Sequence, residues 1–294
     1  LLQKSSKEFP LSVVAELNGS ARGSSIDTEI LGLAGVGTRV ENGVPGQIMH
    51  RIVPEGESLD PCRRLLEESA AKESSFFAGY VPDNDGDRGN LVYWDRETHA
   101  ASPLQAQEVF ALSCLSELAY LSRMNMQSGG NGELPNTAVA VNGPTSLRID
   151  AIASAFGAGV FRAEVGEANV VNLARKLRSE GKIVRILGEG SNGGNITHPA
   201  ACRDPINTLL SVIKLMLLRS DSEYPGLFQI WWNKSTQSKA FPKNFTLPDI
   251  IASLPEFATT SAFEDRAIMR IASRDHGKLK EAYESLFLDE WSTI

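Results

Sequence analysis

Short apolar runs alternate with amphipathic segments along the first hundred residues of the chain. Alternation of apolar runs with helical patterns of about 10–15 residues is typical of βαβ units and of a largely parallel sheet. The pattern predicts strands at residues 11–17, 38–41, 76–81 and 90–94, and helices at 26–34 and 59–72.

A second series of the same kind follows. The sequence SPLQ at residues 102–105 predicts a helix start, with Ser as the cap, Pro at the first helical position and Gln completing a capping box. We place a domain boundary just before it, at residues 98–102. The second series predicts strands at residues 137–141, 160–164 and 182–187, and helices at 146–156, 168–179 and 205–219.

The expected fold is therefore α/β, with two tandem α/β domains whose sheets are mixed but mainly parallel. We assign residues 1–101 to the first domain and residues 102–222 to the second. Residues 223–294 lose the alternation and read as a helix-rich extension or as the start of a further C-terminal domain.

Composition narrows the possible partners. The 294 residues include 29 Lys and Arg against 36 Asp and Glu, a net charge of −7. Without a dense basic run, such a chain is a poor electrostatic partner for nucleic acid or an anionic membrane. The apolar stretch at 209–218 contains a Lys and is much shorter than the roughly 20 residues of a membrane span. Three widely spaced cysteines without a CxxC pair fit a reducing cytoplasm. We expect a cytoplasmic protein without nucleic-acid or membrane partners.

An acidic loop separates two predicted strands at residues 82–89, PDNDGDRG. In an extended loop, side chains two residues apart point to the same side, so Asp83, Asp85 and Asp87 can converge. Converging carboxylates repel one another unless a cation lies between them, and oxygen ligands suit Mg²⁺ or Ca²⁺. Arg88 could bind an anion beside that metal.

Two other interpretations compete with the metal site. An EF-hand loop would need Gly at its sixth position and Glu at its twelfth, where this chain has Arg88 and Trp94. That motif is therefore excluded. A solvated, Asp-rich turn is common and stays possible. The position after an apolar strand, at the open end of an α/β sheet, favours the metal site.

These residues resemble those of a known family, the α-D-phosphohexomutases, which include phosphoglucomutase and phosphomannomutase. The family's second domain carries a D-x-D-G-D-R loop, and residues 83–88 match it. The resemblance implies that Asp83, Asp85 and Asp87 hold Mg²⁺ and that Arg88 contacts a phosphorylated serine nucleophile. Residues 13–23 are similar to the opening of that second domain, and residues 142–158 to the opening of the third.

A glycine-rich run, GEGSNGGN, follows the predicted strand at residues 182–187. It formally fits the dinucleotide fingerprint G-x-G-x-x-G, but no helix opens directly after it and the expected acidic residue is missing. It also resembles the family's third-domain motif G-E-x-S-G, which implies that Glu189 and Ser191 bind sugar hydroxyls. Asn192 departs from that motif. Glu167 lies where the family places a specificity loop, and it also reads as an ordinary helix N-terminal acid.

The resemblance covers roughly residues 10–220 and implies a Mg²⁺-dependent isomerase that moves phosphate between the 1- and 6-positions of a hexose. The family also needs a Ser-His nucleophile motif and a phosphate-binding loop, and the sequence contains neither. We therefore expect a fragment that works with the remaining domains of the same enzyme and a hexose phosphate substrate, and that is inactive alone. The alternatives are a non-catalytic protein that binds metal or sugar phosphate and, less favoured, a nicotinamide-dependent oxidoreductase.

Overall fold

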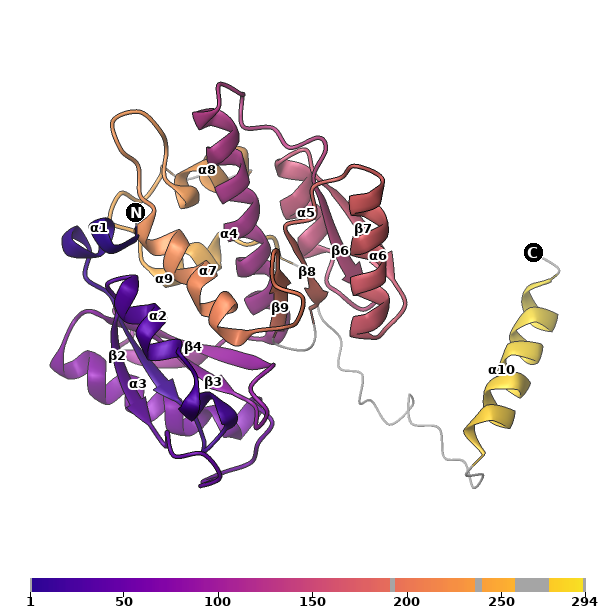
Figure 1. Cartoon of the computed structure of the whole chain (residues 1–294), viewed down its shortest axis with the longest axis horizontal. Coiled ribbons are helices and arrows are strands. Elements are labelled where there is room, and N and C mark those ends of the chain that lie inside the picture. The colour runs from indigo at the N-terminus through magenta and orange to yellow at the C-terminus, as the bar shows by residue number, and fades with distance from the viewer. Residues whose placement is uncertain (1, 191–193, 236–239, 257–274, 293–294) are drawn as a thin grey trace. The chain divides into compact units, whose positions relative to one another are not determined.

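The computed structural model describes residues 2–190, 194–235, 240–256 and 275–292 (Figure 1). The chain divides into two units, Leu1–Phe257 and Ala258–Ile294. The first unit holds both sheets. In the described part of the second unit lies one helix, α10 (His276–Trp291).

The first sheet has the strand order β2-β1-β3-β4-β5. Strands β1 to β3 are parallel, while β4 and β5 are added antiparallel. Its helices are α1 (Leu2–Glu8), α2 (Asp27–Leu33) and α3 (Asp60–Lys72), with 3₁₀ turns at Ala21–Ser24 and Gly56–Leu59. Its strands are β1 (Ser12–Glu16), β2 (Gly37–Glu41), β3 (Phe76–Pro82), β4 (Gly89–Asp95) and β5 (Ala100–Pro103).

The second sheet has the order β7-β6-β8-β9, with only the β8–β9 pair antiparallel. Its strands are β6 (Ala138–Asn142), β7 (Gly159–Ala163), β8 (Ile186–Glu189) and β9 (Gly194–Thr197). The helices of this half are α4 (Ala106–Gln127), α5 (Arg148–Ala155), α6 (Glu167–Ser179), α7 (Pro205–Leu217), α8 (Leu227–Lys234) and α9 (Leu247–Ala252).

The two sheets share one topology. In each, the first strand lies inside, the second pairs on one side, the third pairs on the other, and the fourth runs antiparallel beside the third. The prediction of tandem α/β domains with mixed sheets is confirmed. The acidic loop joins β3 to β4 and the glycine-rich loop joins β8 to β9, so they occupy corresponding positions.

Two details of the predicted elements were wrong. The helix predicted to start at residues 102–105 starts later, because Ser102 and Pro103 pair with β4 as part of the edge strand β5. An edge strand tolerates proline, which has no N–H to donate. The actual cap of α4 is Gln105, in a capping box with Glu108. Strand β9 was not predicted at all, since its four residues, GNIT, carry little apolar pattern.

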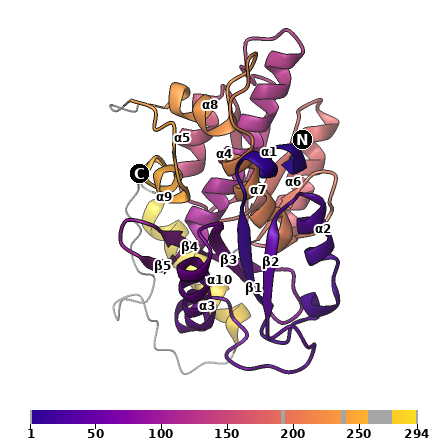
Figure 2. The same ribbon diagram turned by 90° about the vertical axis from the view of Figure 1, so that its left-hand side faces the viewer.

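A continuous core joins the two α/β halves. The long helix α4 is buried along most of its length, and its apolar side chains cluster with residues from both sheets, such as Val13 and Val139. Helices α7 and α8 pack against α4, and Trp231 of α8 is buried in the same cluster. On the opposite face of the first sheet, α3 forms a separate small core with β1, β3 and β4 (Figure 2). The shared core therefore fixes the position of one sheet relative to the other.

Candidate metal and sugar-binding site

The acidic loop is a tight connection between the antiparallel strands β3 and β4. The amide of Asp83 donates to the carbonyl of Arg88 at 2.9 Å and closes the loop. Gly86 has a φ of 80°, and a Cβ there would lie 2.6 Å from Cδ of Arg22. Both the left-handed backbone and the close approach of Arg22 therefore require glycine at this position.

Asp83 organises this loop from inside. Its side chain is buried, and Oδ1 accepts hydrogen bonds from the amides of Gly86 and Arg88, each at 3.1 Å. Oδ2 accepts from Nε of Arg88 at 2.7 Å. The hydrogen bond with Asp83 raises the pKa of the Arg88 guanidinium. The carboxylate thus fixes the loop backbone and the direction of Arg88 together.

The three predicted metal ligands converge. One carboxylate oxygen from each of Asp83, Asp85 and Asp87 lies within 4.8 Å of the others, and within the described residues no other group of three or more metal-ligating side chains does so. Oxygens bound to Mg²⁺ at about 2.1 Å are at most about 4.2 Å apart, so a small closure of the side chains satisfies that geometry. Because all three ligand atoms are carboxylate oxygens, this group of side chains suits a hard cation. The residues present therefore fit Mg²⁺.

Arg203 links the acidic loop to the second half of the molecule. It precedes α7, and its guanidinium pairs with the carboxylate of Asp87. Its Nε lies 2.8 Å from Oε2 of Glu167, the first residue of α6. The Arg203 side chain is 15% exposed, so both pairs are partly shielded from water. Sequence reasoning missed this residue as a functional contact, because 116 positions separate it from Asp87.

A second arginine makes a parallel connection. Nη2 of Arg22, in the turn after β1, lies 2.6 Å from Asp27 and 2.8 Å from Asp204, the residue that caps α7. The buried Asp27 also accepts a 2.8 Å hydrogen bond from Tyr80 of β3. Burial lowers the pKa of Arg22, but hydrogen bonding and attraction to Asp27 outweigh it, so the net shift is upward. Arg22 therefore holds the start of α7 beneath the acidic loop.

Backbone packing brings the acidic loop close to the start of β9. A Cβ added to Gly194, at the start of β9, would lie 3.1 Å from the carbonyl oxygen of Asp87. A Cβ on Gly89, at the start of β4, would lie 2.7 Å from the ring of Pro205. Glycine at both positions allows this close approach. The acidic loop thus lies against the start of β9, and the start of β4 lies against the start of α7.

Glu189 lies at the end of β8 and is buried. Its Oε1 accepts from Nδ2 of Asn142 at 2.9 Å and from the amide of Gly166 at 2.8 Å. Thr145 donates to Oδ1 of the same asparagine at 2.6 Å. The carboxylate therefore joins the ends of β6 and β8 to the turn before α6. Sugar binding by this residue stays a prediction, and Ser191 lies outside the described residues.

Comparison with known proteins identifies part of this architecture. Residues 116–228 match the α/β/α domain III of phosphoglucomutase/phosphomannomutase. The chain contains a domain of the phosphoglucomutase/phosphomannomutase family. No curated protein sequence is significantly similar to the chain.

Solved structures of the same family share the wider fold. A phosphoglucomutase/phosphomannomutase family protein from Burkholderia thailandensis is 14% identical, with a TM-score of 0.53 over 76% of this chain. The phosphoglucomutase parafusin from Paramecium, in its open form, is 17% identical, with the same TM-score over 85% of this chain. The chain spans 44% and 38% of the lengths of these two structures. The likeness extends beyond domain III to the sheet that carries the acidic loop. The family is one of isomerases acting on sugar phosphates.

Among the described helices, none is long and apolar enough to cross a membrane.

Proposed function

We propose that this chain supplies the metal-binding and sugar-binding domains of a phosphohexomutase. The complete enzyme would interconvert a hexose 1-phosphate and a hexose 6-phosphate in the cytoplasm, through a phosphoserine and a bisphosphorylated sugar. The observation that carries this proposal is the acidic loop of residues 83–88, whose Asp87 pairs with Arg203 inside the segment that matches the family's domain III. The nucleophile and the loop for the non-reacting phosphate would come from the remaining domains.

The residues of this chain have separate tasks in that proposal. Asp83, Asp85 and Asp87 would hold Mg²⁺, which when bound supplies positive charge for a phosphoryl group in transfer. Arg88 would add a fixed donor and a second positive charge on the same phosphoryl oxygens. Its own hydrogen bond to Asp83 keeps its direction before substrate arrives.

The glycine-rich connection would orient the sugar. A buried carboxylate such as Glu189 can accept from two sugar hydroxyls, which is both charge-assisted and geometrically selective. Ser191 would add a hydroxyl beside it. The contact between Glu189 and the amide of Gly166 ties this connection to the loop that precedes α6. Substrate preference would then depend on both loops together.

Metal binding tests the first task directly. Calorimetric titration of the chain with Mg²⁺ is expected to show binding that Asp85→Asn weakens at least tenfold, because one charged oxygen ligand is lost. The exposed Asp289→Asn on α10 provides a matched control with the same loss of charge and unchanged binding. Equal Mg²⁺ binding by wild type and Asp85→Asn would remove the loop from the metal site.

Catalysis is tested with and without the remaining domains. The 294-residue chain alone is expected to show no mutase turnover, because it lacks a Ser-His pair for the nucleophile. The complete enzyme should show turnover that depends on Mg²⁺. Turnover by the chain alone would contradict the division of tasks. A complete protein that binds Mg²⁺ and hexose phosphate without turnover would support the non-catalytic alternative.

The fold weakens the oxidoreductase alternative. A dinucleotide-binding glycine motif joins a strand to the N-terminus of a helix. Here the glycine-rich run joins β8 to the antiparallel β9, and the next helix begins only at Pro205. Titration with NADH, followed by its fluorescence, should show no binding. Stoichiometric NADH binding would restore that alternative.

A further inference from the structure

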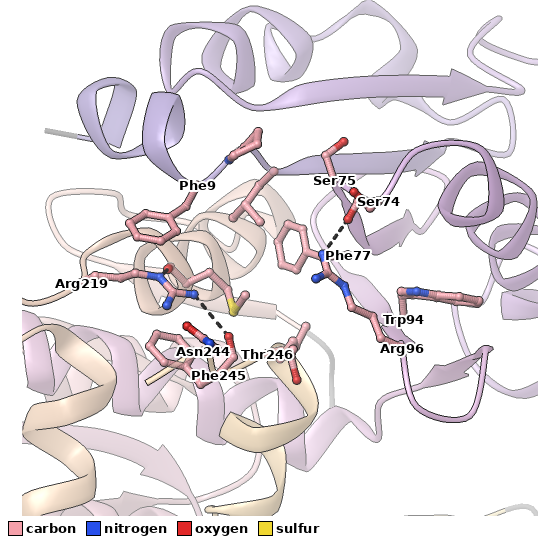
Figure 3. A pocket seen from close by; sticks show the side chains of 14 residues that line it. Phe9, Ser74, Ser75, Phe77, Trp94, Arg96, Arg219, Asn244, Phe245 and Thr246 are labelled. Atoms are coloured by element: carbon pink, nitrogen blue, oxygen red, sulfur yellow. Dashed lines mark hydrogen bonds between the residues drawn. The ribbon is translucent and has the colours of Figure 1, made fainter. Parts of the chain in front are cut away.

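A cavity lies at the other end of the first sheet, away from the acidic loop (Figure 3). It occupies about 270 Å³ between the starts of β1 and β3, the end of β4 and the segment around the start of α9. Strand β3 separates the two locations, with Phe77 near its first residue and Asp83 just after its last. A strand of this length spans roughly 20 Å, so the cavity is distinct from the candidate metal site.

Two arginines from different elements line this cavity. Arg96 comes from the β4–β5 turn, and Arg219 follows α7. Figure 3 shows their guanidinium groups approaching the cavity from two sides. Among the described lining residues there is no Asp or Glu, and within the described part of the chain neither arginine has a carboxylate partner. In a protein of net charge −7, this is an uncompensated positive site.

Both guanidinium groups are positioned and still have donors to offer. Nη2 of Arg96 donates to the carbonyl of Ser74 at 2.6 Å. Arg219 donates one hydrogen bond each to the carbonyls of Met216, Lys243 and Phe245, at 3.2 Å. A guanidinium has five N–H groups, so two N–H groups of Arg219 have no acceptor among the described residues. Burial lowers the pKa of Arg219.

Aromatic rings form the rest of the wall. The guanidinium of Arg219 lies over the rings of Phe9 and Phe245, at 4.3 and 4.0 Å from their centroids. Phe77 lines the side towards Arg96, whereas the indole of Trp94 packs with the α3 core on the other face of the sheet. A dry cavity of about 150 Å³ accommodates a benzene ring, so 270 Å³ has room for one ring with one anionic group. It is too small for a dinucleotide.

We propose that this cavity is a binding site for a small organic anion, a single ring that bears one carboxylate or phosphate group. The anionic group would pair with Arg96 and with the remaining donors of Arg219. The ring would lie against Phe77. Because the walls come from the first sheet and from the α7–α9 region, a bound anion stabilises the junction between the two α/β halves. This proposal does not depend on the proposed catalytic function.

The test uses phenyl phosphate as the probe, titrated calorimetrically into the whole chain in buffer containing EDTA. One molecule per chain is expected to bind. Benzyl alcohol, which has the ring without the charge, and inorganic phosphate, which has the charge without the ring, should each bind at least tenfold more weakly. Equal affinity for phenyl phosphate and inorganic phosphate would refute the role of the ring. A binding free energy of about −4 kcal/mol corresponds to a Kd of about 1 mM. If no binding of phenyl phosphate is detected at concentrations up to about 10 mM, ten times that Kd, the site is refuted.

Variants locate the binding. Arg96→Met keeps the apolar stem of an exposed side chain, so the fold should persist, and phenyl phosphate affinity should fall at least tenfold. Arg96→Lys, which keeps the charge, should retain most of the affinity. Arg175→Met, an exposed arginine on α6, carries the same charge change and should leave binding intact. Asp85→Asn should also leave it intact, which separates this cavity from the acidic loop. Equal loss in Arg96→Met and Arg175→Met, or loss in Asp85→Asn, would refute the assignment.

Discussion

Replacing Arg203 with methionine removes a positive charge that lies between Asp87 of the acidic loop and Glu167 of α6. Methionine keeps an unbranched apolar stem, so the packing of that stem changes little. Two charge-assisted contacts are lost. Both carboxylates are more than a third exposed, so water screens these contacts. Each contact therefore contributes about 0.5–1 kcal/mol to the free energy of unfolding, less than a buried pair would. The free energy of unfolding should fall by about 1–2 kcal/mol.

Mg²⁺ affinity should change in the opposite direction. Arg203 neutralises part of the negative charge of Asp87, one of the predicted ligands. Two unit charges about 5 Å apart interact by on the order of 3 kcal/mol at an effective dielectric of about 20, and by half of that at about 40. Removing the guanidinium therefore strengthens cation binding at this loop by about 1.4 kcal/mol or more. That corresponds to a roughly tenfold lower Kd for Mg²⁺.

The two effects are measured on the same variant. Thermal unfolding without metal should show a Tm lower by roughly 2–8 °C, given about 2–4 °C per kcal/mol for a chain of this size. Calorimetry should show the tighter Mg²⁺ binding. Arg175→Met controls for the change in net charge, and Arg203→Lys should restore most of the wild-type behaviour. Mg²⁺ affinity that is unchanged, or changed equally in Arg175→Met, would refute the electrostatic coupling between Arg203 and the acidic loop.

Three further outcomes are expected. Glu117→Gln should destabilise the fold by about 3 kcal/mol or more in chemical denaturation, because the buried carboxylate pairs with both Lys214 and Arg185 and its loss leaves both cations without that partner. Asp221→Asn should lower stability at pH 7, and the difference from wild type should disappear in strong acid. The backbone amides of Tyr224 and Glu223 lower the pKa of Asp221, so its contribution is present above the unfolded pKa of about 3.9 and disappears as the pH falls through the folded value. In the complete enzyme, Glu189→Gln should reduce kcat/KM by roughly 10- to 100-fold with little change in Tm, whereas a large loss of Tm with intact kcat/KM would leave Glu189 a purely structural residue.

The stronger elements of the fold could be predicted because their signals are local. The helix expected at residues 59–72 is α3 (Asp60–Lys72), and the strand expected at 76–81 is β3 (Phe76–Pro82). Apolar periodicity over that many residues specifies a buried face by itself. Weak elements behaved differently. Strand β9 has four residues with little apolar pattern, and it forms because β8 offers an unpaired edge beside it.

Within the candidate site, too, some features could be predicted from the sequence and others could not, as the acidic loop shows. Asp83, Asp85 and Asp87 were predicted to converge from their spacing, and they do. The physical reason differs from the predicted one, because the backbone turns tightly at Gly86 instead of staying extended. The fixed direction of Arg88 also follows from its neighbour Asp83. These contacts span at most five residues. The short spacing was therefore sufficient to predict the convergence of the carboxylates, whereas the contact between Arg88 and Asp83 was not predicted.

What the sequence alone determined is thus the local chemistry: two series of α/β elements, a loop of three converging carboxylates and a glycine-rich connection. The tertiary structure decided which of these groups meet. Arg203 reaches Asp87 across 116 positions, and Arg22 reaches Asp204 across 182. The cavity between Arg96 and Arg219 likewise joins a turn of the first sheet to the end of α7. Such contacts depend on how the shared core orients the two sheets, and that orientation is a sum of many small packing energies that no short motif records.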